Sequence, residues 1–569
     1  MKTLRTLTLA VALSATLSAC SDFLTYEPKG TISGDQLNTP ENIEGLVVAA
    51  YAALGNDHWE VPYTSLWPYG NVRAGDAYKG GGGIGDQVAY NNMEQFVYLT
   101  PSEGKVDNLW YRLYIGISRA NDALRRLNEI SEAEFPAKTV RQAEMRFIRG
   151  HFYFLLKILF NRVPWIDETV PVEEYETISN IALSSDELWE KIAADFRFAA
   201  ENLPPVQPEK GRVNKYAATA YLAKVQLYRA YPQDENHRVI GVDPAKLEEV
   251  VQLTDQVIGS GLYELTADFA ENFLWETEEN SEVVFAIKMS VNDGTPTGRV
   301  DMGNGLNYNM AYGCCWFHIP SQNLINAFKT DENGLPQFET YNQTSLVDSL
   351  DYWTNNIDPR LDHTVGIVGH PFKYDPNFIF QPGWARAPQV YGMHSSMKEV
   401  QHPSCPCLRA VGPFWASSKD VVVIRYADVL LWKAEALIEL GRHMEALPII
   451  NKIRQRAANS TGRLKYADGS PVANYYIQPY PASLWTQEYA RRALRWERRL
   501  ELALEGHRFF DLVRWGIAAE TLNEYFAVEK TRREYLQNAR FTAGRDEYLP
   551  IPEAQIAFSK GLYRQNPGY

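Results

Sequence analysis

Apolar residues recur at helical spacing through most of the chain, and the recurring stretches are separated by Gly, Pro or capping Ser and Asp residues. Amphipathic stretches of this kind predict helices at residues 108–130, 140–160, 185–203, 213–231 and 244–258. The clearest unit spans residues 426–457, where two helical stretches flank a turn at Gly441 and small residues face each other across the pair. We therefore predict a mainly α-helical fold built from helix hairpins.

The hairpins follow the pattern of tetratricopeptide repeats, which are about 34 residues long. Residues 217–259 repeat the scheme with an insertion at 232–243 between their two helices, and residues 141–203 repeat it more loosely. Stacked hairpins of this kind form a curved scaffold. The predicted tetratricopeptide-like helix-hairpin scaffold covers about residues 40–55, 100–260 and 420–569.

Two regions lack this periodicity, at about residues 56–99 and 290–419. They are rich in Gly, Pro, Asn, Trp and Tyr, and they contain only short strand-like runs, such as residues 282–289. Long irregular segments within a compact protein usually carry function. We predict a large irregular, loop-rich region with short strands, which presents ligand-binding loops on the helical scaffold.

Aromatic residues make up 12% of the chain, and many of them lie in these two regions. A flat Trp or Tyr face can stack on the CH-bearing face of a sugar ring while polar side chains bind the hydroxyls. Core packing is the alternative for any single ring, but for the group we favour a sugar platform. The candidate ligand-binding residues are Asp57, Trp59, Trp67, Asp76, Tyr78, Cys314, Cys315, Trp316, Trp384, Arg386 and Tyr391. We predict that Trp316→Ala or Asp76→Ala lowers glycan affinity without unfolding the protein.

The start of the chain has the pattern of a lipoprotein signal peptide. Lys2 and Arg5 precede an apolar run at residues 7–17, which is too short to span a bilayer, and Leu-Ser-Ala-Cys ends at Cys20. We predict a signal peptide at residues 1–19 and acylation of Cys20, which would anchor the mature protein to a membrane. The formal net charge of −14 and the lack of a basic block exclude nucleic acid as a partner.

Four further cysteines allow three disulfide pairings. A bridge between the adjacent Cys314 and Cys315 would form a flat, rigid, apolar patch suited to a sugar face. The alternative is two bridges that join one long loop to another. A zinc site is the weakest option, because the spacing is wrong and no His flanks Cys405-Pro-Cys407.

Catalytic motifs are few. Gly80, Gly82 and Gly85 match G-x-G-x-x-G, but we expect no strand before them and no clear helix after them, so we interpret them as a pliant loop. Phosphate-binding loops, zinc-protease motifs, nucleophile elbows and EF-hand loops are missing from the sequence. We therefore predict no catalytic residue, no cofactor and no metal ligand. A glycosidase would need a carboxylate pair, and the sequence singles out none.

Several long motifs resemble the SusD/RagB family of Bacteroidetes nutrient-binding lipoproteins. They are CSDFL at 20–24, the stretch 110–121, IRYADVLL at 424–431 followed by AEA at 434–436, ERRLELALEGHRFFDLVRWG at 497–516, YLPIP at 548–552 and QNPGY at 565–569. Within 497–516, acids and Arg residues at helical spacing can form ion pairs, while Leu500, Leu504 and Phe509 pack inward. We interpret these motifs as structural and assign them no ligand.

The resemblance implies a single SusD-like domain at residues 20–569 and a function without catalysis. Family members lie on the outer face of the outer membrane and bind oligosaccharides through loop aromatics. They act as a lid over a SusC-like TonB-dependent transporter. The acid cluster that often follows the lipidated Cys is reduced here to Asp22, so surface exposure is implied by the family and not by this segment. The alternatives are a surface glycoside hydrolase and a peptide-binding RagB-like protein.

Overall fold

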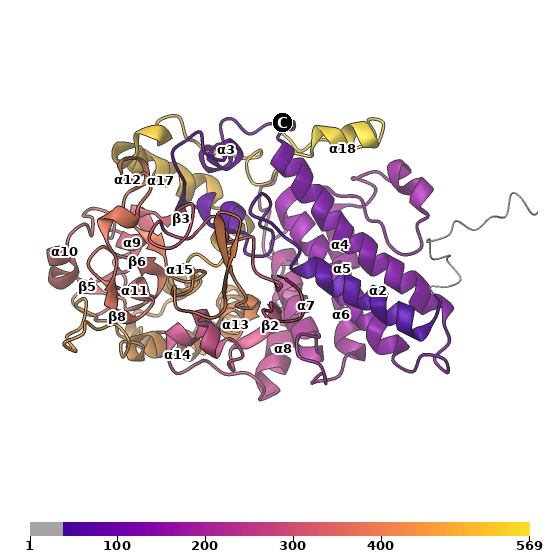
Figure 1. Cartoon of the computed structure of the whole chain (residues 1–569), viewed down its shortest axis with the longest axis horizontal. Coiled ribbons are helices and arrows are strands. Elements are labelled where there is room, and N and C mark those ends of the chain that lie inside the picture. Colours follow the sequence, from indigo (N-terminus) through magenta and orange to yellow (C-terminus); the bar gives the residue numbers. More distant parts are fainter. Residues whose placement is uncertain (1–37, 297) are drawn as a thin grey trace, which may run out of the picture.

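The computed structural model describes residues 38–296 and 298–569 (Figure 1). The signal peptide, Cys20 and the motif at 20–24 lie outside the described residues, so their predictions are not tested. Within the described residues the fold is mainly helical with short strands, and the predicted fold class is confirmed. No helix in this part of the chain combines the length and the apolar character needed to cross a membrane.

The first helical half is a stack in which each helix packs against the next in sequence. The interior of α5 is strongly apolar, so nearly every residue of its second half is buried between α4 and α6. Figure 1 shows these helices side by side in indigo to magenta. All five helices predicted here are present, with bounds shifted by a few residues: α4 (Gly104–Glu129), α5 (Lys138–Phe160), α6 (Ser185–Asn202), α7 (Lys215–Arg229) and α8 (Pro244–Gly259), with α2 (Pro40–Leu54) before them.

The second helical half continues the same stack, because its first helix, α13, packs against α8 as well as against α14 and α15. The hairpin predicted at 426–457 is confirmed, and Gly441 adopts a positive φ of 78° in its turn. The helices are α13 (Tyr426–Glu439), α14 (His443–Asn459), α15 (Gln487–Glu501), α16 (Arg508–Arg514), α17 (Ala518–Arg532) and α18 (Glu553–Phe558).

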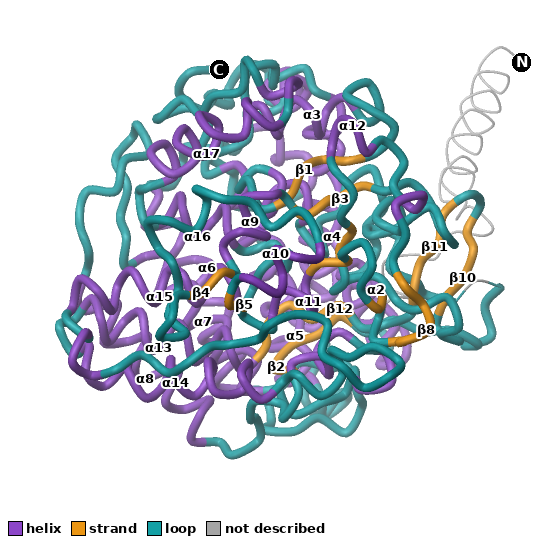
Figure 2. Tube along the Cα trace, turned by 90° about the vertical axis from the view of Figure 1, so that its left-hand side faces the viewer, coloured by secondary structure: helices purple, strands orange, loops and turns teal. Residues whose placement is uncertain are grey.

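The two irregular regions carry short helices and strands that pair two by two (Figure 2). The paired strands are β1 (Ala77–Gly80) with β3 (Phe317–Pro320), β2 (Val283–Ile287) with β12 (Val421–Arg425), β4 (Lys329–Thr330) with β5 (Asn356–Ile357), β6 (Val365–Gly366) with β9 (Ser395–Ser396), β7 (Pro371–Phe372) with β8 (Asp375–Ile379), and β10 (Leu408–Val411) with β11 (Phe414–Ser417). The short helices are α3 (Val88–Gln95), α9 (Gln322–Ala327), α10 (Ser349–Thr354), α11 (Arg360–Thr364) and α12 (Pro388–Tyr391).

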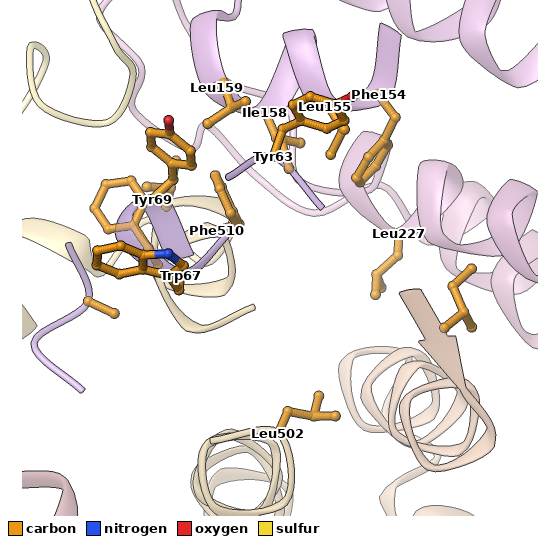
Figure 3. Packing of buried hydrophobic residues seen from close by; sticks show 14 of the residues in the cluster. Tyr63, Trp67, Tyr69, Phe154, Leu155, Ile158, Leu159, Leu227, Leu502 and Phe510 are labelled. Atoms are coloured by element: carbon orange, nitrogen blue, oxygen red, sulfur yellow. The ribbon is translucent and has the colours of Figure 1, made fainter. Parts of the chain in front are cut away.

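Tighter or wider helical turns complete the described elements. A π-helix spans Trp67–Val72, and 3₁₀ turns lie at Val172–Thr177, Phe269–Phe273, Trp275–Thr277, Pro382–Trp384, Ala482–Leu484 and Glu534–Leu536. The π-helix packs against α16 and α3, so the first irregular region runs through the middle of the molecule. Figure 3 shows the consequence, with Trp67 and Tyr69 beside Phe510 in the main core.

The motif at 497–516 holds the scaffold together, as predicted. Glu501 lies in the interior and accepts hydrogen bonds from the guanidinium groups of Arg425 and Arg456. The neighbouring Glu497 forms buried ion pairs with Arg360 and Arg454. Because each buried carboxylate faces more than one guanidinium, the charges compensate one another without water. Leu500, Leu504 and Phe509 are buried, as predicted.

A second, smaller core lies under the loops of residues 308–415. Its buried members are Tyr308, Phe372, Phe380, Met397, Val400, Cys405, Cys407 and Leu408. Satellite clusters of this kind form beneath long loops that the main core does not reach. Figure 2 shows β8, β10 and β11 together at one edge of the molecule, where this second core supports them.

Candidate functional site

Two of the predicted sugar-binding rings in the first irregular region belong to the interior. Trp67 is 1% exposed, packs edge-on to Tyr90 with ring centroids 5.1 Å apart, and donates from Nε1 to the Gly303 carbonyl at 3.1 Å. Tyr78 is fully buried, and its hydroxyl donates to Glu529 at 2.6 Å. The expectation that these rings form an exposed platform is therefore corrected, because the segment that carries them runs through the core.

The prediction that Asp76 binds ligand at the surface is also corrected, because Asp76 has a structural role. Its side chain is fully buried, and its Oδ1 accepts hydrogen bonds from Nε and Nη2 of Arg499 at 2.9 and 2.7 Å. Arg499 lies in the helix that begins the 497–516 motif, so this ion pair joins the first irregular region to the second helical half. Replacing Asp76 would disturb the scaffold before it reached a ligand.

Trp316 and Tyr391 are fully buried in the main core. The main chain of Trp316 is hydrogen-bonded on both sides: its N–H donates to the Tyr308 carbonyl, and its carbonyl accepts from the Gly81 N–H. Tyr391 packs edge-on to Tyr535, with ring centroids 5.2 Å apart. Neither ring offers a face to solvent, so the expectation that Trp316→Ala acts on glycan binding alone is also corrected.

The remaining candidates of the second irregular region gather at the surface. The half-buried Trp384 packs on Phe378, with ring centroids 4.7 Å apart and planes inclined by 37°. Tyr312 and His402 extend this group, at 6.2 and 5.0 Å from the Phe378 ring. We call the four rings, together with the Cys314–Cys315 disulfide and the Arg386–Asp86 ion pair, the Trp384 surface.

Both disulfides stabilise the loops around this surface. Cys314 pairs with Cys315, as the apolar-patch interpretation requires, and Cys405 pairs with Cys407. The alternatives of two bridges between distant loops and of a zinc site are therefore wrong. Trp384 is hydrogen-bonded to the loop that leads to Cys314 and Cys315, because its carbonyl accepts from the Met310 N–H at 3.0 Å.

An ion pair lies at the edge of the disulfide. Arg386 donates from Nη1 to Asp86 at 2.9 Å and to the Cys315 carbonyl at 3.4 Å. The same Asp86 oxygen accepts from the Gly82 N–H at 2.9 Å. The buried Lys79 supports this glycine loop from below through its hydrogen bond to the Gly83 carbonyl at 2.8 Å. The glycine-rich segment therefore forms one wall of the Trp384 surface.

The expectation that no strand or helix flanks these glycines is wrong, since β1 precedes them and α3 follows them. A dinucleotide site is still not formed, because β1 pairs antiparallel with β3 and no parallel βαβ unit surrounds the loop in the described residues. The side chains of Asp86 and Lys79 hold the loop through their hydrogen bonds to the main chain of Gly82 and Gly83.

Trp59 lies on a separate aromatic group. Its half-buried ring packs on Phe414 at 5.4 Å, and the Lys105 ammonium lies 5.3 Å from the centre of the ring. No ring contact joins this pair to the Trp384 surface in the part of the chain described. It remains a second place where a sugar could stack.

A pair of buried carboxyl groups has unusual protonation. Burial, reinforced by the neighbouring Asp301, raises the pKa of Asp57 to about 7, and burial raises the pKa of Asp301 to about 6. Asp301 lines a partly open pocket of about 100 Å³, which is below the roughly 300–1,000 Å³ typical of ligand pockets. Asp57 is covered by Gly303, so the pair does not face the rings of the Trp384 surface.

Sequence reasoning missed Asp86, Tyr312, Phe378, Asp375 and His402. All five lie in the two regions predicted to bind ligand, yet their residue types and spacing do not set them apart from buried neighbours such as Phe372 and Phe380. Only pairing in three dimensions brings Asp86 to Arg386 across 300 residues. Among the described residues, no group of three or more His, Cys, Asp or Glu side chains could hold a metal ion.

Comparison with known proteins gives two family matches. A family model described as "SusD family" matches residues 281–569, and one described as "Starch-binding associating with outer membrane" matches residues 22–227. A curated relative, SusD-like protein P2 of Formosa agariphila, is 25% identical over 578 residues, covering 98% of each chain.

Two solved structures share the fold. A SusD homolog from Bacteroides thetaiotaomicron superimposes with a TM-score of 0.70 at 21% identity, covering 95% of this chain and 100% of the other. Surface glycan-binding protein A from Bacteroides thetaiotaomicron, solved in complex with laminarihexaose, has a TM-score of 0.64 at 20% identity, covering 93% of this chain and 99% of the other.

Proposed function

The chain belongs to the SusD family, and on that basis we propose that it is a glycan-binding lipoprotein of the outer membrane. In this proposal Cys20 carries the lipid anchor, the folded part faces the cell exterior, and bound oligosaccharide passes to a SusC-like TonB-dependent transporter that the protein covers as a lid. The protein captures its ligand and returns it without cleavage.

The observation that carries the proposal is the Trp384 surface. The half-buried rings of Trp384, Phe378 and Tyr312 form one group of ring contacts, and the Arg386 guanidinium nearby in sequence joins Asp86 to the Cys315 carbonyl of the Cys314–Cys315 disulfide. Ring faces suit the CH-bearing side of a sugar, and a neighbouring Arg–Asp pair suits its hydroxyls. The relative solved with laminarihexaose supports a glycan as the ligand class.

The carboxylate pair does not favour the glycosidase alternative. Hydrolysis needs one acid and one base flanking the scissile bond, whereas the side chains of Asp57 and Asp301 are both buried, and the pocket that Asp301 lines has a volume of only about 100 Å³. The peptide alternative would need pockets for side chains along a groove. The Trp384 surface instead presents flat rings.

The test is a binding screen of the protein from residue 21 onward against a panel of polysaccharides. Affinity gels identify the ligand, calorimetry measures its affinity, and chromatography of the recovered sugar detects cleavage. We expect binding with the sugar intact. Cleavage would indicate the glycoside hydrolase alternative, and binding of peptides but of no glycan would indicate the RagB-like alternative.

Two variants locate the site. Trp384→Ala and Phe378→Ala each remove a stacking ring and should weaken glycan binding by about fivefold or more, since a stacked aromatic contact contributes of order 1 kcal/mol or more. The matched control is Trp353→Ala, which removes an exposed Trp on α10, away from these contacts. Equal losses in all three variants would refute the placement of the site.

The delivery step needs its own test. Co-expression with its SusC-like transporter, followed by isolation through a tag on either protein, should recover both proteins in one complex. Removal of Cys20 should leave glycan binding unchanged and abolish uptake by cells. The lid role would be refuted if cells took up the glycan normally when the lipid anchor, or the whole protein, was missing.

A further inference from the structure

The ionisable groups at the Trp384 surface carry more negative than positive charge. Arg386 is 38% exposed, and its charge is balanced by Asp86, which is 28% exposed and 2.9 Å away. Asp375 adds a second carboxylate, 37% exposed, at the start of β8, the strand that carries Phe378. These exposed ionisable groups are therefore one guanidinium and two carboxylates, with Asp86 beside Arg386 and Asp375 beside His402.

The other basic groups nearby do not cancel this excess. His402 Nε2 lies 3.4 Å from the Asp375 carboxylate, but burial lowers the pKa of His402 below its usual value, so the ring is neutral at pH 7. Lys79 lies under the glycine loop, is fully buried and donates to main-chain carbonyls. Lys373, close to His402, is also buried and donates to two main-chain carbonyls. None of the three therefore meets a ligand on the surface as a free cation.

Both hydrogen-bond donors and hydrogen-bond acceptors of this ion pair remain without a partner in the part of the protein that the structure describes. Arg386 uses only Nη1, so its Nε and Nη2 donors have no partner among the described residues. Asp86 uses only Oδ2, which leaves Oδ1 as an open acceptor in the same part of the chain. A sugar hydroxyl both donates and accepts, so adjacent hydroxyls satisfy this pair.

A carboxylate or sulfate group on the sugar would fit poorly in the same place. Such groups only accept hydrogen bonds at neutral pH, so they leave the open Asp86 oxygen unpaired. They also bring a like charge near Asp86 and Asp375, and like charges at close range repel. Arg386 could attract them, but its charge is already engaged by Asp86.

We infer that the Trp384 surface accepts uncharged saccharides and rejects those that carry carboxylate or sulfate groups. Asp86 and Asp375 impose this choice, by exclusion of the wrong ligand as much as by binding of the right one. The inference rests on the proposed glycan-binding function and names the chemical class of its ligand. The formal net charge of the whole chain, −14, also repels anionic saccharides at longer range.

The test uses pairs of polysaccharides that share a backbone and differ in charge. Suitable pairs are laminarin with sulfated laminarin, dextran with dextran sulfate, and methyl-esterified with de-esterified homogalacturonan. We expect a neutral member to bind and its charged partner to bind at least about tenfold more weakly in dilute buffer, where charges act over about 30 Å. Added salt should narrow the difference.

Three variants connect the preference to its residues. Asp86→Asn and Asp375→Asn keep the shape of each side chain and remove its charge, so each should strengthen binding of the charged member relative to the neutral one by about three- to tenfold. Glu332→Gln is the matched control, because Glu332 is an exposed acid in the turn after β4, outside the Trp384 surface.

The outcomes separate this inference from the function beneath it. A charged member that binds wild type as tightly as its neutral partner, or variants that leave the ratio unchanged, would overturn the charge selection while glycan capture stood. If wild type binds no glycan of either class, the proposed function fails and the inference fails with it. Binding of a neutral member with restored binding of its partner in the Asn variants supports both.

Discussion

Asp76→Ala offers a quantitative test of the division between scaffold and ligand surface. In the native protein the fully buried Asp76 carboxylate accepts two hydrogen bonds from Arg499, whose side chain is 6% exposed. The variant leaves this guanidinium buried with neutral partners such as the Asn323 amide oxygen, 2.8 Å away, and without its carboxylate. Removing one partner of a buried ion pair costs about 3–5 kcal/mol, because the other charge stays desolvated.

The matched control is Asp86→Ala, which removes a carboxylate from an ion pair at the surface. The Arg386 guanidinium that remains can be hydrated, and exposed ion pairs contribute about 0–1 kcal/mol. Urea unfolding at pH 7, followed by circular dichroism, measures the free energy of unfolding of both variants and wild type. The expected difference between the two variants is about 2–5 kcal/mol.

The same pair of variants should behave in the opposite way toward glycan. At a temperature where it stays folded, Asp76→Ala should bind with wild-type affinity, whereas Asp86→Ala should bind more weakly because it loses an open acceptor at the Trp384 surface. A loss of unfolding free energy below about 1 kcal/mol for Asp76→Ala would refute the reasoning from a desolvated charge. Weakened glycan binding in that variant would restore Asp76 as a ligand residue.

Two further substitutions test the interior, and a third at the exposed Gly45 serves as a control. Burial, reinforced by Asp301, raises the pKa of Asp57 to about 7, so the wild type loses stability as the pH rises from about 4 to 7, a range in which the unfolded chain has already lost this proton. Asp57→Asn should therefore gain stability relative to wild type over this range. Urea midpoints at pH 5 and pH 8 measure the difference in stability, and equal differences at both pH values would contradict the reasoning. Gly70→Ala would bring a Cβ within 2.0 Å of the Gly506 carbonyl oxygen and should destabilise by at least about 2 kcal/mol. Gly45→Ala, with open space around it in α2, should instead stabilise by about 0.5–1 kcal/mol in the same urea experiment, and equal effects would contradict the steric argument.

The helices were predictable because their signal is local. An apolar stripe that recurs every three to four residues can be buried only by packing against a neighbouring helix, so α4 to α8 and the α13–α14 hairpin follow from spacing alone. The structural role of the 497–516 motif was predictable for the same reason, since its acids and Arg residues lie on helical faces. The partners of those charges, such as Asp76, were not predictable, because they come from hundreds of residues away.

The first irregular region shows why irregular sequence does not imply a surface. Residues 67–81 contain Gly, Pro, Asn and aromatic residues, the composition of a binding loop, yet all of them are buried. The segment runs between α16 and β3, where its rings fill the space that a regular helix or strand would leave. Trp67 and Trp384 therefore have the same local signal and opposite environments. The glycine loop at the end of this segment reaches the Trp384 surface through Asp86, which accepts a hydrogen bond from Arg386.

The rings Trp384, Phe378 and Tyr312 of the Trp384 surface pack on the second core, which separates their packing energies from those of the scaffold. Phe378 and Trp384 pack on the second cluster, which the Cys405–Cys407 bridge ties together, and not on the helices that carry the Glu501 network. Substitutions in two groups that share no contacts add independently, whereas substitutions within one group couple. Charge changes at Asp86 or Asp375 should therefore alter ligand choice with little effect on the scaffold, while Asp76, though it lies in the same irregular region as Asp86, is energetically part of the helices.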